Sequence, residues 1–189
     1  MKHILPTLAL TLVSTTLHAD EFRPALEEYL STNVAMWVDD PVLISAIRSA
    51  NSVTAGYGPD QINAMDQAWR AEVGMATTPT ITPILKNEAA AFLRDIVDAS
   101  EGTITEVFIM DGVGLNAAAS GVTSDMWQGD EAKFTSTYAM GSDAIHISEV
   151  EFDESSQSYA GQISMTITDP DTGAPLGAIT VGINPERLF

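Results

Sequence analysis

The sequence predicts an α+β fold in which helices come first and an antiparallel sheet follows. Up to about residue 100, apolar residues recur at steps of three and four, which is typical of amphipathic helices. After residue 103 many apolar residues are β-branched and alternate with polar ones, as in half-buried strands. Short turns separate the last three of these segments, which favours an antiparallel meander over a parallel sheet.

The first 19 residues have the features of a secretory signal peptide. Lys2 and His3 precede an apolar stretch over 4–13, and small and polar residues then lead to Ala19. This segment is too short for a good membrane span, which needs about 18 apolar residues. We expect cleavage after Ala19, a mature periplasmic protein that begins near Asp20, and no direct membrane insertion after processing. The alternative is that the N-terminus is retained as an anchor.

Four helices are expected before residue 102. The first begins near Pro24, whose missing N–H is harmless in a first turn, and ends before Pro41. A short helix over 42–49 follows, and the third begins with Asp60 as its cap after a glycine-rich break. A loop over 77–83 leads to the fourth helix, which ends near residue 100.

Five strands are expected in the second half, over residues 104–110, 115–120, 144–152, 159–168 and 176–183. A loop with a short helix over about 129–137 separates the second strand from the third. In the third strand the apolar residues change face between Ile147 and Val150, which predicts a β-bulge or a strong twist. The last strand combines an apolar face with a face of small residues.

Composition excludes several classes of partner and chemistry. The chain has 189 residues, 26 acidic and 8 basic, and a formal net charge of −18. Nucleic acid and anionic membrane surfaces are therefore not expected partners, because both attract basic proteins. There is no cysteine, which excludes disulfides and thiolate catalysis. The length suits a single domain over 20–189, with a helical part over 20–102 and a mainly sheet part over 103–189.

The segment from Val107 to Ala118, with its Asp-Gly turn at Asp111, resembles the Cache family of extracytoplasmic sensor domains (PAS-like, PDC-type). Residues 124–131, 150–154 and 177–182 look like the stand-alone periplasmic members of that family, and the resemblance covers about residues 24–188. It implies a PAS-like five-stranded antiparallel sheet, with the long N-terminal helices on one face and a small-molecule pocket on the other.

The resemblance also implies a function. We expect a secreted, non-enzymatic sensor module that captures a small molecule reversibly. Membrane-bound members continue into a transmembrane helix and an output domain, whereas this chain stops at Phe189, so we expect it to act through a separate protein, such as a membrane receptor or transporter component. The alternatives are an accessory or enzyme-associated periplasmic protein that reuses the fold, and a structural protein with a filled pocket.

No catalytic constellation is recognisable, and we expect no enzymatic activity, no cofactor and no metal site. A serine hydrolase needs a nucleophile, a base and an acid, but G-x-S-x-G is absent and His146 lies in the middle of an apolar strand. Asp169, Asp171 and Gly173 begin like a calcium loop, yet Thr180 occupies the position of the expected bidentate acid. A hairpin turn is therefore expected there.

The candidate ligand site lies in the sheet half. Trp127 is outside any helical apolar stripe, so it either forms a pocket wall or closes the end of the core. Lys133 is the single basic residue between Arg94 and Arg187, so it either meets a carboxylate ligand or makes a surface ion pair. The expected ligand is a small polar metabolite, such as a carboxylate or an amino acid. The expected contact residues are Trp127, Tyr138, His146, Asp125, Lys133 and Ser148.

Overall fold

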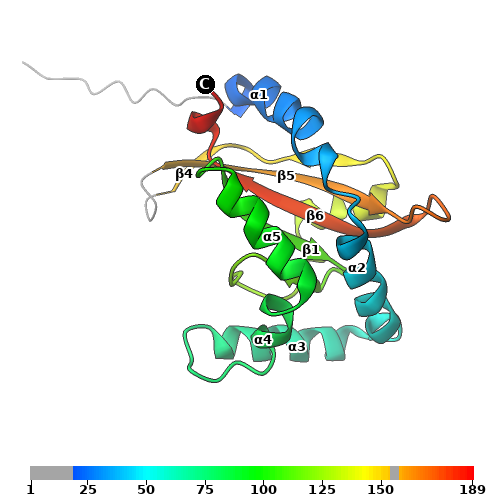
Figure 1. Ribbon diagram of the computed structural model, residues 1–189. Coiled ribbons are helices and arrows are strands. Elements are labelled where there is room, and N and C mark those ends of the chain that lie inside the picture. Colours follow the sequence, from blue (N-terminus) through cyan, green and yellow to red (C-terminus); the bar gives the residue numbers. More distant parts are fainter. Residues whose placement is uncertain (1–18, 154–157) are drawn as a thin grey trace, which may run out of the picture.

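The computed structural model describes residues 19–153 and 158–189 (Figure 1). The expected signal peptide lies outside these ranges, apart from Ala19, so its cleavage stays a prediction. None of the helices in the described ranges combines the length and the hydropathy that crossing a bilayer requires.

The helical part contains five α-helices and one 3-10 turn. They are α1 (Ala19–Thr32), η1 (Val34–Met36), α2 (Pro41–Thr54), α3 (Pro59–Glu72), α4 (Ile81–Leu85) and α5 (Glu88–Ala99). The N-cap of α2 is Asp40, whose carboxylate accepts a hydrogen bond of 2.9 Å from the Val42 N–H. The helix expected over 42–49 is longer than predicted, because no glycine or proline interrupts it before Gly56.

Two predictions at helix ends are wrong. The N-cap of α3 is Gly58, and Asp60 lies in the first turn instead. The segment over 77–83, expected to be a loop, contains the start of α4. The cause is a contact distant in sequence: the Glu72 carboxylate accepts the backbone N–H groups of Thr80 (2.8 Å) and Ile81 (3.0 Å), which would otherwise lack partners at a helix start.

The sheet is antiparallel throughout, with the order β2-β1-β6-β5-β3, so the α+β class and the five-stranded sheet are confirmed. A sixth short strand, β4, pairs with β5 beside this path. Short helical turns lie in the connections and after the last strand. The remaining elements are β1 (Ile104–Met110), β2 (Asn116–Ala119), α6 (Ala132–Thr135), η2 (Tyr138–Met140), β3 (Ile145–Ile147), β4 (Glu151–Asp153), β5 (Ser158–Thr168), β6 (Pro175–Ile183) and η3 (Pro185–Leu188).

The strand expected over 144–152 is two strands, β3 and β4, rather than one strand with a bulge. Between them the Ser148 side chain takes part in the ladder, because its hydroxyl accepts the Gln162 N–H at 2.8 Å. Val150 then turns inward next to Gly161, where a Cβ would lie 3.1 Å from the Val150 Cγ2 atom. The change of apolar face is therefore made by an interruption of the strand.

The two faces of the sheet are covered differently. One face, here called the helix face, carries Val107, Ile109 and Val181 and packs against α1, α2 and α5. The other, here called the α6 face, carries Phe108 and contacts Phe134 of α6. In Figure 1, α5 crosses in front of β1 and β6, and the segment that contains α6 lies behind them. The predicted packing of the N-terminal helices on one face is confirmed.

Candidate functional site

The turn between β1 and β2 is fixed by a buried carboxylate. Asp111 is 1% exposed; its Oδ1 atom accepts the N–H groups of Val113 (3.0 Å) and Leu115 (2.9 Å), and its Oδ2 atom accepts the Thr54 hydroxyl (2.7 Å). Burial raises the pKa of Asp111, and these hydrogen bonds offset part of that rise. Asn51 of α2 accepts the Gly112 N–H at 2.7 Å, so α2 holds the turn at two points.

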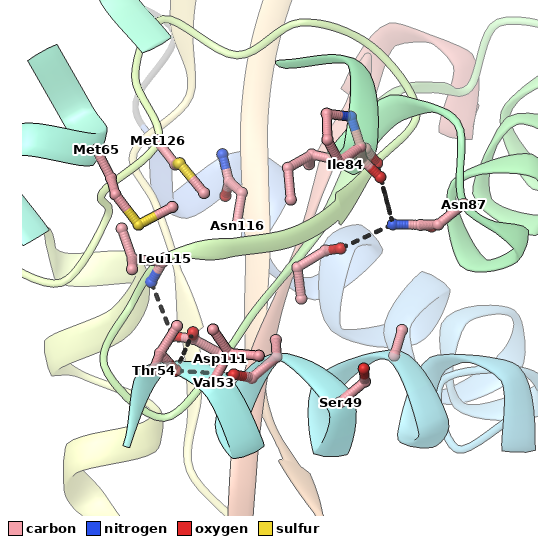
Figure 2. A pocket seen from close by; sticks show the side chains of 14 residues that line it. Ser49, Val53, Thr54, Met65, Ile84, Asn87, Asp111, Leu115, Asn116 and Met126 are labelled. Atoms are coloured by element: carbon pink, nitrogen blue, oxygen red, sulfur yellow. Dashed lines mark hydrogen bonds between the residues drawn. The ribbon is translucent and has the colours of Figure 1, made fainter. Parts of the chain in front are cut away.

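Beside this turn lies a pocket of about 400 Å³, here called the α2 pocket (Figure 2). The pocket lies next to the edge strand β2, and the C-terminal half of α2 forms one of its walls. In Figure 2, Met65 and Met126 lie together on one side and Ile84 and Asn87 on the other, with Asn116 between them. The lining residues are Ala46, Ser49, Ala50, Val53, Thr54, Met65, Pro83, Ile84, Asn87, Asp111, Leu115, Asn116, Ala117 and Met126.

Most polar groups of the α2 pocket already have partners. Asn87 caps α5 by accepting the Ala90 N–H at 2.8 Å, and its Nδ2 atom donates to the Ala117 carbonyl at 3.0 Å. Both oxygens of Asp111 accept hydrogen bonds from the chain. The described lining residues include no basic side chain. An anionic ligand would therefore lose its hydration without gaining an opposite charge, and the Asp111 carboxylate in the lining already has hydrogen bonds to both of its oxygens.

Asn116 is the exception. Its side chain is 2% exposed, and its Oδ1 atom accepts no hydrogen bond from any residue of the described ranges. The amide orientation is fixed, because Nδ2 donates to the Asp125 carbonyl (3.1 Å), which cannot itself donate, and to the Thr123 hydroxyl (2.9 Å). A buried acceptor without a partner costs about 1–3 kcal/mol. A ligand that donates to Oδ1 would recover part of this free energy.

Two of the predicted site residues, Asp125 and Lys133, belong to one polar network. Arg70 of α3 donates from Nε to Asp66 (2.7 Å) and from Nη2 to Asp125 (3.0 Å). Gln128 then links Asp125 to Lys133, because its Nε2 atom donates to the Asp125 carboxylate and its Oε1 atom accepts Lys133 Nζ at 3.1 Å. The network therefore connects α3 to the α6 face.

Asp66 is a member of this network that the sequence analysis missed. Burial alone would raise the pKa of Asp66, but hydrogen bonds from Arg70 and from the Trp127 and Met126 N–H groups lower it below its ordinary value. The Asp66 carboxylate thus fixes the loop that contains Trp127. A possible sequence signal was the Asp66–Arg70 spacing of four residues, which places both side chains on one side of a helix.

Trp127 packs against the β1–β2 turn. Its indole N–H donates to the Val113 carbonyl at 2.9 Å, and a Cβ on Gly129 would lie 2.3 Å from the indole nitrogen. The ring also contacts a cluster around Trp69 and Leu115. Of the two interpretations of Trp127, these contacts favour the one in which it closes the end of the core.

Lys133 lies at the α6 face. Its ammonium group lies 5.5 Å from the centre of the Phe108 ring and 3.0 Å from the Glu131 carboxylate. Tyr138 lies close by, because its ring stacks on Phe134 with centroids 5.0 Å apart. Lys133 thus has an ion-pair partner and an aromatic contact at once.

His146 and Ser148 lie farther away on the sheet. His146 of β3 pairs with Ser164, which pairs with Thr180, which in turn pairs with Phe108. Three strand spacings separate His146 from Phe108, or roughly 14 Å. The structure therefore brings Asp125, Trp127, Lys133 and Tyr138 into one region and leaves His146 and Ser148 at its far side. None of the six lines the α2 pocket.

The pocket residues were missed by the sequence analysis. One signal was available: Asn116 is the only amide in the apolar and small-residue run Leu115–Ala119. A polar residue in such a run is either paired or functional. The contribution of α4 through Ile84 had no local signal, because α4 depends on the distant Glu72.

No protein-family model matches the sequence, and no curated protein matches it. Similar solved structures include the sensor domain of the V. cholerae histidine kinase DctB, with 11% identity over 90% of this chain and 57% of that chain, and a TM-score of 0.40. Another is the ligand-binding domain of the Campylobacter jejuni chemoreceptor Tlp3 in complex with 4-methylisoleucine, with 15% identity over 90% of this chain and 57% of that chain, and a TM-score of 0.43.

A third similar structure is an extracellular ligand binding receptor from Desulfohalobium retbaense, with 13% identity, 80% of this chain and 26% of that chain covered, and a TM-score of 0.36. The chain spans about 57% of the length of the DctB and Tlp3 chains. The ligands and activities of those whole proteins are therefore stated of those proteins alone. DctB and Tlp3 are represented by extracytoplasmic sensor domains of the Cache type, the type that the segment around Asp111 resembles.

Proposed function

We propose that this protein is a non-enzymatic small-molecule-binding module of the sensor type, exported through a cleaved signal peptide and acting through a separate partner protein. The observation that supports it best is the α2 pocket, whose lining is apolar over much of its surface and includes Asn116, a buried residue whose Oδ1 atom has no hydrogen-bond partner among the described residues. Ligand sites commonly combine an apolar lining with a few polar groups that set the ligand's orientation.

The pocket defines the chemistry of its ligand. An uncharged molecule with one hydrogen-bond donor fits, because, among the described residues, the Asn116 Oδ1 atom lacks a donor, the lining includes no basic side chain, and the Asp111 oxygens already accept hydrogen bonds from the chain. Its apolar part would lie against Met65, Met126 and Ile84 (Figure 2). Binding would then hold α2 and α4 against β2, and the changed surface of these helices would be what the partner protein recognises.

The test compares hexanol with hexyl methyl ether, which has the same apolar body but no donor. We expect hexanol to raise the melting temperature and to bind about ten-fold more tightly in calorimetry, the effect of about one hydrogen bond to a buried acceptor. Ser49→Leu should block the pocket from an exposed lining position, and Ser45→Leu is the matched control, since Ser45 is exposed on the same helix but does not line the pocket. Equal binding of both probes, or of hexanol to both variants, would contradict the proposal.

The α6 face is a second candidate site, for the carboxylate or amino acid ligand expected from the sequence. The supporting observation is Lys133, whose ammonium group lies between the Phe108 ring and the Glu131 carboxylate. A ligand carboxylate would replace Glu131 as its partner, and Asp125, which Gln128 links to Lys133, is the predicted residue placed to contact the rest of the molecule. His146, three strand spacings from Phe108, is too distant for a ligand of this size. Isoleucine, which combines a carboxylate with an apolar body, is the probe for this site.

A further inference from the structure

A second cavity lies on the other side of the α2 pocket wall. It has a volume of about 420 Å³, lies between α3 and α4, and is here called the α3 groove. Its lining includes Ala64 and Ala68 of α3, and Pro79 and Thr80 just before α4. No ionisable side chain is among the described residues that line it.

The two cavities share four lining residues: Met65, Pro83, Ile84 and Met126. Pro83 and Ile84 belong to α4, which therefore borders both. Figure 2 shows the Met65 and Met126 side chains next to each other at the α2 pocket side of this wall. The partition between the cavities thus consists of part of α4 and two methionines.

The two parts of the partition differ in stiffness. The start of α4 is held by two hydrogen bonds from its backbone to Glu72, so α4 is fixed to the end of α3. Methionine side chains have three rotatable bonds and no branches, and they adapt to the shape of what they contact. Met65 is only half-buried, so it can change rotamer at small cost.

We propose that the α2 pocket and the α3 groove are two halves of one site, which holds an uncharged ligand with a long unbranched alkyl chain. The donor end of the ligand lies at Asn116, and the chain passes beside Met65, under α4, into the α3 groove. This inference rests on the proposed function and adds the length and shape of the ligand to it.

The lining supports a linear apolar chain rather than a bulky ring system. Beyond the methionines the α3 groove is bordered by small side chains, Ala64 and Ala68, and by the proline at position 79. Each methylene that this lining removes from water should raise the affinity by a factor of about four.

The experiment measures the binding of hexanol, octanol and decanol by calorimetry to the full chain. If the chain continues into the α3 groove, affinity should rise by about four-fold per methylene from hexanol to decanol, on the order of 10²-fold in total. If the α2 pocket alone binds, the rise should stop once that pocket is filled, and decanol should bind no more tightly than octanol.

Three variants assign the effect to each half. Ala64→Leu fills the α3 groove from an exposed position and should bring decanol to within about four-fold of hexanol while leaving hexanol binding unchanged. Ala71→Leu, exposed on the same helix but outside the groove, should have no effect. Ser49→Leu in the α2 pocket should weaken all three alcohols.

The outcomes separate the two proposals. Loss of the decanol advantage in Ala64→Leu, together with intact hexanol binding, supports the continuous site. Binding of hexanol that depends on Ser49, without any further gain for decanol, overturns the continuous site and leaves the proposed function standing. If no alcohol binds, both fail.

Discussion

Thr54 donates a hydrogen bond of 2.7 Å to Asp111, which joins the end of α2 to the β1–β2 turn across 57 residues of sequence. The same hydroxyl also contacts the Ala50 carbonyl of its own helix. Both residues line the α2 pocket. The contact therefore sets the position of one pocket wall relative to the sheet.

Thr54→Val should destabilise the protein by about 1–3 kcal/mol, because it leaves a buried carboxylate oxygen without its donor. The free energy of unfolding, measured by chemical denaturation, is the readout. Thr54→Ser keeps the hydroxyl and is the control. The prediction is wrong if the valine variant is no less stable than the serine variant.

Asp111→Asn should change how stability depends on pH. Burial raises the pKa of Asp111, so the folded chain holds this proton more tightly than the unfolded chain. The contribution of Asp111 is then fully present below the unfolded pKa and is lost as the pH rises through the folded pKa. The asparagine variant does not ionise, so its stability relative to the wild type should increase as the pH rises from about 4, the ordinary value of an aspartate, through the raised pKa of folded Asp111.

The comparison with the wild type matters because other carboxyl groups act in the opposite direction. The pKa values of Asp66, Glu72 and Asp169 are lowered in the folded protein, so each contributes stability that is lost as the pH falls. These contributions cancel in the difference between variant and wild type. A difference that stays constant over this pH range would contradict the role assigned to Asp111.

Gly114→Ala should cost about 2 kcal/mol or more. Gly114 has φ of +85°, a conformation unfavourable for residues with a Cβ, and a Cβ there would lie 2.5 Å from the Gly129 Cα atom. Gly56→Ala is the matched control, because nothing lies within 4 Å of its Cβ position. A similar melting temperature for the two variants would show that the turn does not need this close approach.

The α6 face candidate is tested with isoleucine. Trp127→Ala and Lys133→Met should each weaken its binding more than ten-fold, the effect of about 1.4 kcal/mol. Trp127 acts here by holding the loop, and Lys133 by meeting the carboxylate. Ser49→Leu should leave isoleucine binding unchanged, since Ser49 lines the α2 pocket. Unchanged affinity in the first two variants would remove this candidate.

Cleavage of the signal peptide is tested by measuring the intact mass of the protein. If the signal peptide is cleaved, the protein recovered from the periplasmic fraction should begin near Asp20, and intact-mass spectrometry should show the loss of residues 1–19. A full-length mass in the membrane fraction would favour the retained anchor.

The central strands were predictable because their signals are local. β1 has the predicted bounds, Ile104–Met110, and β6 differs from its prediction by one residue. The run of β-branched residues in each is bounded by a turn that contains glycine, and no distant contact is needed to set its ends. Two of the failures, α4 and the division between β3 and β4, depend on partners elsewhere: Glu72 for the helix, and Gly161 for the inward turn of Val150.

The candidate site was less predictable than the fold. Trp127 and Lys133 stand out in sequence because they are rare residue types in their surroundings, and rarity says nothing of what a side chain touches. The pocket is formed by ordinary residues such as Ala46 and Met65, which three different helices bring together. Only the Asn116 Oδ1 atom, which accepts no hydrogen bond from the described residues, distinguishes the pocket. Its lack of a partner arises from the folded structure and is not visible in the sequence.

The strand order has a consequence for biosynthesis. β6 lies between β1 and β5 in the sheet and follows both of them in the sequence. Until β6 has been synthesised, β1 and β5 each have an edge whose backbone N–H and C=O groups lack strand partners. Ile104, for example, cannot pair before Ile183 is present. Pairings over such long sequence separations form slowly, and open edges invite aggregation. The centre of the sheet can therefore form only after β6 has been synthesised, and until then the open edges of β1 and β5 are exposed to aggregation.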